Sequence, residues 1–62
     1  MCEATAYLVK NGQEELLLKD VDIIEPDGDS LRIINIFGEQ KVVKAQIHSL
    51  NLIEHKVFLV EP

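Results

Sequence analysis

The residue with the most distinctive chemistry in the sequence is Cys2, which is the only cysteine. Met1 is usually removed when the second residue is small, and Cys2 then carries both a free α-amine and a thiolate. These two donors close a five-membered chelate ring on a metal ion, and planar nitrogen and sulfur donors suit Ni(II) or Cu(II). Two chains related by a two-fold axis supply two such pairs, a complete four-coordinate set, in which backbone amides or water can replace an amine. We therefore expect Cys2 to be a metal ligand shared between two copies of the chain.

The other residue types that do chemistry in proteins are poorly grouped. His48 and His55 lack the spacing of a zinc site, which needs four protein ligands, and we interpret both as surface or turn residues. The acidic residues between Asp20 and Asp29 do not follow the calcium-loop pattern, and aspartate in turns is explained by local hydrogen bonds to the backbone. No paired catalytic groups appear at a recognisable spacing. We expect a protein that is not an enzyme.

The charge and the sequence ends point to the cell compartment and the class of partner. The formal net charge is −5, with eleven acidic residues against six basic ones. Nucleic-acid binding needs clustered Lys and Arg, so we expect cations or proteins as partners instead. A lone thiol favours a reducing compartment, and neither a signal peptide nor a membrane-spanning run is apparent. The prediction is a cytoplasmic protein that does not enter a membrane.

The hydrophobic pattern predicts short strands separated by turns. Asn11-Gly12 is the favoured pair for a tight hairpin because both residues accept positive φ, and turns are also expected at residues 26–29 and 38–39. Residues 45–50 are compatible with a short helical turn or an irregular crossing. A last hairpin is expected around His55-Lys56. The expected strands are residues 3–10, 14–19, 21–25, 30–37, 40–45, 51–54 and 57–60.

This pattern predicts the fold class. Six or seven short strands in one domain spanning residues 1–62 indicate an all-β fold, most simply a small SH3-like β-barrel. The segments 33–37 and 57–60 are apolar on both faces, but a barrel of this size has only one interior. A chain this small has only a small core, and with a single cysteine it cannot form an internal disulfide that would stabilise that core. We therefore expect a homodimer, in which a second copy covers part of an outer face.

Several segments resemble a known family. They are Met1-Cys2-Glu3-Ala4, Tyr7-Leu8-Val9-Lys10, Asp20-Val21-Asp22, Phe37-Gly38-Glu39-Gln40-Lys41 and His55-Lys56-Val57-Phe58-Leu59. Together they are similar to the CooT family of small nickel-binding proteins, over essentially the whole chain. The resemblance implies a homodimer of SH3-like barrels that binds one Ni(II) through Cys2 of both chains. It also implies a link to the maturation of carbon monoxide dehydrogenase. Only Cys2 matches as a metal ligand.

The leading hypothesis is a nickel metallochaperone or nickel store whose client is a nickel enzyme such as carbon monoxide dehydrogenase. The alternative is a metal-independent interaction module, protein-binding or RNA-binding, with an SH3-like or Sm-like barrel. The two hypotheses differ at Cys2, which only the first requires.

Overall fold

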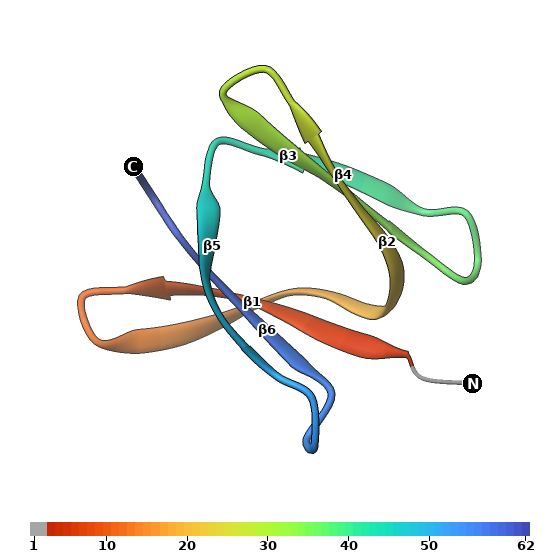
Figure 1. Cartoon of the computed structure of the whole chain (residues 1–62), viewed down its shortest axis with the longest axis horizontal. Coiled ribbons are helices and arrows are strands. Elements are labelled where there is room, and N and C mark those ends of the chain that lie inside the picture. The colour runs from red at the N-terminus through yellow and green to blue at the C-terminus, as the bar shows by residue number, and fades with distance from the viewer. Residues whose placement is uncertain (1–2) are drawn as a thin grey trace.

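Strands form all the regular structure of the computed structural model, which describes residues 3–62 (Figure 1). This confirms the predicted all-β class. The strands are β1 (Ala4–Lys10), β2 (Gln13–Asp27), β3 (Ser30–Asn35), β4 (Gln40–Val43), β5 (Gln46–Asn51) and β6 (Lys56–Val60).

The six strands form one sheet in the order β4-β3-β2-β1-β6-β5. Every neighbouring pair is antiparallel except β1 and β6, which run parallel. The two edge strands, β4 and β5, are joined only by Lys44 and Ala45. Such a link spans about 10 Å, since each residue step covers at most about 3.6 Å. The sheet must therefore roll up until its edges approach, which gives the predicted barrel-like shape, although β4 and β5 do not pair and the barrel stays open.

The long strand β2 corrects the prediction of two strands separated at Asp20. Asp20 has a φ of +58°, and the pairing register shifts on both sides of Val21. A left-handed residue next to such irregularities bends a strand sharply without ending it. The first half of β2 consequently pairs with β1 and the second half pairs with β3, so Asp20 marks the corner of the rolled sheet.

The turns follow the predictions in part. Asn11 and Gly12 have φ values of +53° and +76°, which confirms the tight hairpin. The turn predicted for residues 26–29 is shorter, because Pro26 and Asp27 still belong to β2 and pair with β3. Beyond Val21 the strand β2 has lost β1 as a neighbour, and proline is tolerated where a strand is paired on one side only.

The end of the chain differs most from the prediction. Residues 45–50 were predicted to form a helical turn or an irregular crossing, but residues 46–50 belong to the edge strand β5. Residues 52–55, which were split between a strand and a turn, form the turn between β5 and β6. The strands predicted over 30–37 and 40–45 are also shorter, ending at Asn35 and Val43.

The core lies inside the rolled sheet and consists of two adjoining clusters. The first contains Ala6, Val21 and Ile33, and the second contains Ala45, Val57 and Leu59. Leu17 and Ile24, from the two halves of β2, pack against both clusters and join them into one core. Each central strand thus contributes alternate side chains to the interior, as period-two strands must.

Candidate metal centre at the start of the first strand

Cys2, the predicted metal ligand, lies outside the described residues, which begin at Glu3. The structure does define the strand that directly follows it. Ala4 is paired with Val21 at the corner of β2, and Thr5 is paired with Lys56 at the start of β6. The amide of Thr5 donates a hydrogen bond of 2.9 Å to the carbonyl oxygen of His55. The start of β1 is therefore fixed on both sides, within three residues of Cys2.

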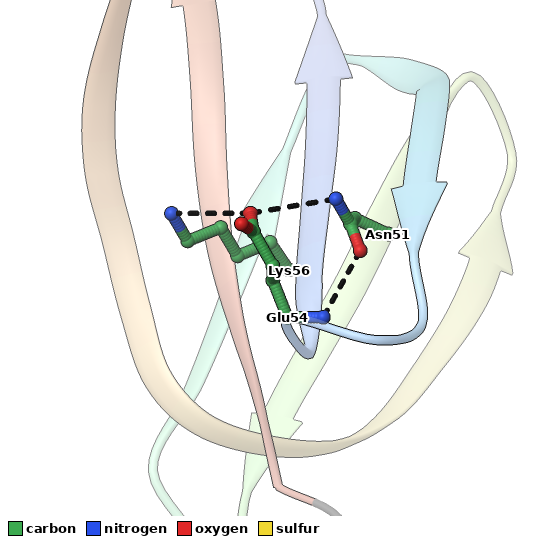
Figure 2. Close-up of polar contacts among 3 residues, drawn as sticks. All are labelled: Asn51, Glu54 and Lys56. Atoms are coloured by element: carbon green, nitrogen blue, oxygen red, sulfur yellow. Dashed lines mark hydrogen bonds and ion pairs between the residues drawn. The ribbon is translucent and has the colours of Figure 1, made fainter.

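The turn between β5 and β6, beside the start of β1, is held by polar contacts (Figure 2). The Oδ1 atom of Asn51 accepts a hydrogen bond of 3.0 Å from the amide of Glu54, and its Nδ2 atom lies 3.4 Å from Oε1 of Glu54. The same carboxylate oxygen lies 3.7 Å from Nζ of Lys56. These contacts fix a turn whose first two residues, Leu52 and Ile53, are 78% and 91% exposed.

An aromatic pair continues this support along β1 and β6. The rings of Tyr7 and Phe58 stack with centroids 5.6 Å apart and an interplanar angle of 21°. The ammonium group of Lys56 lies 5.8 Å from the centroid of the Tyr7 ring, within the range of a cation–π contact. Three neighbouring side chains therefore reinforce the parallel pairing that positions the start of β1.

The turn between β3 and β4 is held from inside by Asn35, the buried polar residue of the described chain. Its Oδ1 atom accepts hydrogen bonds from the amides of Phe37 (3.0 Å) and Glu39 (2.9 Å), and its Nδ2 atom donates to the Glu39 carboxylate at 2.7 Å. Gly38 has a φ of +82° and donates its amide to the carbonyl of Asn35 at 3.1 Å. The side chain of Phe37 nevertheless projects outward and is 72% exposed.

This second turn also adjoins the start of β1. The amide of Ile36 donates a hydrogen bond of 2.9 Å to the carbonyl oxygen of Asp20. Val21, the next residue, pairs with both Asn35 and Ala4. The two turns, 36–39 and 52–55, therefore flank the segment from which Cys2 extends, one through β2 and the other through β6 (Figure 1).

The remaining candidate ligands stay dispersed. Within residues 3–62, no three His, Cys, Asp or Glu side chains come together as a metal site. His48 lies exposed on β5, and His55 is exposed in the last turn with a φ of +58°. Although His55 is distant from Cys2 in sequence, its backbone lies beside β1. The described part of one chain therefore offers no ready-made cage, and the chemical case for a soft or borderline metal ion depends on the thiolate of Cys2.

A groove on another side of the barrel was not predicted. It has a volume of about 600 Å³ and lies between the β2–β3 turn, the link from β4 to β5 and the end of the chain. Its lining includes Pro26, Asp29, Lys44, Ile47 and Pro62. In the sequence, the groove was visible only as the turn predicted at residues 26–29, which we interpreted as a connection between strands.

No helix in residues 3–62 is long and apolar enough to cross a bilayer.

The fold is an open β-barrel, and the candidate metal ligand Cys2 precedes its first strand in the sequence. These two features are typical of a small metal-binding protein or a small interaction module. The family model described as "CO dehydrogenase accessory protein CooT" matches residues 1–60. The chain belongs to this family. The resemblance inferred from the sequence is therefore confirmed, and the family is one of accessory proteins, not of catalytic ones.

Two relatives support this assignment. An uncharacterized protein of Methanocaldococcus jannaschii, MJ1551, is 37% identical over 59 residues, which cover 95% of this chain and 96% of that protein. A crystal structure of a protein from Carboxydothermus hydrogenoformans, assigned as CooT, superposes with a TM-score of 0.93 at 43% identity and 98% coverage of both chains. The fold and the family are thus established together.

Proposed function

We propose that this protein is a cytoplasmic nickel carrier that binds one Ni(II) between two copies of the chain and supplies it for the maturation of carbon monoxide dehydrogenase. The observation that carries the proposal is the placement of Cys2, the only thiol, directly ahead of a strand whose start is fixed by β2 and β6. The family name supports an accessory role toward that enzyme.

The donor chemistry supports a shared site. One thiolate leaves most positions of a four-coordinate ion unfilled, and residues 3–62 of one chain offer no cluster that could fill them. Two copies related by a two-fold axis provide two thiolates, with amines or backbone amides of the same segments as further donors. Such a site has no closed protein cage around it, so its ligands can be exchanged one at a time, as a carrier requires.

The test is an anaerobic Ni(II) titration of untagged protein whose amino terminus has been defined by mass spectrometry. We expect thiolate-to-nickel charge-transfer absorption that saturates at one nickel per two chains and is lost in Cys2→Ser. His48→Ala and His55→Ala are the matched controls, and both should retain the absorption band and the stoichiometry. Binding that survives Cys2→Ser would remove Cys2 from the mechanism and favour the metal-independent interaction module.

The client is tested separately. Purified nickel-free carbon monoxide dehydrogenase is incubated with the nickel-loaded protein or with an equal amount of Ni(II) in the presence of a competing chelator. We expect the loaded protein to restore activity under conditions in which free Ni(II) is withheld by the chelator. Equal activation by both sources would argue for a nickel store in place of a carrier.

A further inference from the structure

The strand β5 has one side that no other strand of residues 3–62 covers. It pairs with β6 on one side, and its other side borders the open part of the barrel, where β4 and β5 diverge from their link without pairing (Figure 1). All residues from Gln46 to Leu50 are exposed. An unpaired edge presents backbone N–H and C=O groups to solvent, and these groups can pair with another extended chain. The backbone of β5 is therefore available to a ligand that has the shape of a strand.

The inward face of β5 is apolar and half exposed. Ile47 is paired with Leu59, and that partner is buried in the core. Leu50 is paired with Val57, which is also buried. Residues directly opposite each other point to the same face of a sheet, so Ile47 and Leu50 also face the interior. They nevertheless remain 50% and 53% exposed, because the barrel is open beside them. A strand added to this edge places its own inward side chains next to both residues.

The groove described above lies at the start of this edge, so one ligand can occupy both. Gln46 and Ile47 belong to β5 and also line the groove. Ala45 and Leu31 line it as well, and they are part of the second core cluster or pack against it. An apolar side chain that enters the groove from a strand on β5 therefore extends the existing core. The volume of about 600 Å³ is within the range of ligand sites.

The charge around the groove favours an acidic ligand. Lys44 lines the groove, and Lys41 lies on β4 across the open part of the barrel. The ion pairs among residues 3–62 involve other bases, so neither lysine has a carboxylate partner there. Asp29 also lines the groove but forms no ion pair with Lys44. A carboxylate on the ligand is therefore the group that Lys44 lacks.

The edge also carries features that select a short ligand. Its pairing with β6 is interrupted at His48, because Ile47 pairs with Leu59 and Ser49 pairs with the next residue along, Phe58. Bulges of this kind, like lysines on edge strands, are common guards against the association of two long edges. They oppose the pairing of this edge with a second copy of itself. A short strand needs only the regular stretches at residues 46–47 and 49–51.

We propose that the edge of β5 and the groove at its start bind an extended peptide segment of another protein, with an apolar side chain in the groove and a carboxylate beside Lys44. Backbone pairing along β5 supplies the general affinity, and the groove and the lysine supply the preference for sequence, as in other cases of strand addition. The proposal depends neither on nickel nor on Cys2.

The test uses fluorescein-labelled peptides of six residues, the length of β5, and follows their fluorescence anisotropy with purified protein. The acidic probe alternates threonine with valine and ends in leucine and glutamate. We expect it to bind saturably with a Kd below about 1 mM. A second peptide with lysine in place of glutamate should bind at least about tenfold more weakly, because it repels Lys44. A third peptide, with every internal amide N-methylated, should not bind, because it cannot donate backbone hydrogen bonds.

Variants of the protein locate the site. Lys44→Glu should weaken binding of the acidic probe at least about tenfold and strengthen binding of the lysine peptide. Lys19→Glu is the matched control, because it makes the same change of charge at an exposed residue of β2, and it should bind like the wild type. Hydrogen exchange of the wild type with the acidic probe should slow at the amides of residues 46–51. Circular dichroism checks that both variants fold, and the three peptides decide the matter on the wild type if one does not.

Three results would each overturn the proposal. They are the absence of saturable binding of the acidic probe, equal binding of the acidic and lysine peptides, and slowed exchange confined to strands other than β5. The nickel proposal is tested separately, because Cys2→Ser should bind the acidic probe like the wild type. A protein that binds nickel and ignores the probe loses only the strand-addition site, and one that binds the probe without nickel loses only the carrier function.

Discussion

Replacing Asn35 by alanine tests whether the buried amide holds the β3–β4 turn, as its three hydrogen bonds indicate. The substitution removes the acceptor for the amides of Phe37 and Glu39 and the donor to the Glu39 carboxylate. Asn51→Ala is a matched control, because Asn51 is also the last residue of a strand and also caps the following turn. Its two contacts are exposed, and one is as long as 3.4 Å.

The expected magnitudes differ severalfold. A net hydrogen bond contributes about 0.5–1.5 kcal/mol, and one to a charged group about 1.5–3 kcal/mol. Exposure of Glu39 favours the lower end for the charged bond, so Asn35→Ala should lower the free energy of unfolding by about 2–4 kcal/mol. A chain of this length has about 3–9 kcal/mol in total, so the loss is a large part of it. Asn51→Ala should cost about 0.5–1 kcal/mol.

The assay is urea unfolding followed by circular dichroism, at several protein concentrations so that any contribution from association between chains is separated from folding. A drop for Asn35→Ala no larger than that for Asn51→Ala would refute the reasoning. It would mean that water replaces the Asn35 amide at no cost and that the turn keeps its shape without it.

Two further predictions concern the metal and the backbone. In the proposed site, protons compete with Ni(II) for two thiolates. The apparent association constant for Ni(II) should therefore fall about 100-fold per pH unit below about pH 7, or about 10,000-fold if two amines are also ligands. Competition with a chelator measures this slope, and a flat pH profile would exclude thiolate ligation. At the left-handed position 20, Asp20→Val should cost at least about 1 kcal/mol and Asp20→Gly less, measured by urea unfolding. Equal costs would show that φ at this corner is not the constraint.

The strands and tight turns were the most predictable part of the fold, because they depend on local chemistry. Asn11-Gly12 accepts positive φ at both positions, and the hairpin follows from that alone. The corner at Asp20 was misread as a break, since a positive-φ aspartate looks the same in sequence whether the strand bends or ends. Only the pairing of β2 with both β1 and β3 shows that the strand bends at Asp20 and continues.

The predicted position of the last hairpin was wrong because the apolar residues near position 52 were interpreted as part of a strand. Leu52 and Ile53 are the most exposed large apolar side chains of the described residues, and the turn is fixed by Asn51 and Glu54 instead. Cys2 could be selected as a candidate ligand from its chemistry. The placement of both turns on either side of the start of β1 could not, because that depends on the long-range pairing of β3, β2, β1, β6 and β5.

The parallel pairing of β1 with β6 has a consequence for the order of events during synthesis. The segment behind Cys2 is made first, but its neighbour β6 is made about fifty residues later, at about 5–20 residues per second. Contacts between such distant parts of a chain form late and slowly in folding. The start of β1 therefore gains its parallel neighbour only when the chain has been translated through β6, so this edge of β1 stays unpaired until nearly the whole chain has been made.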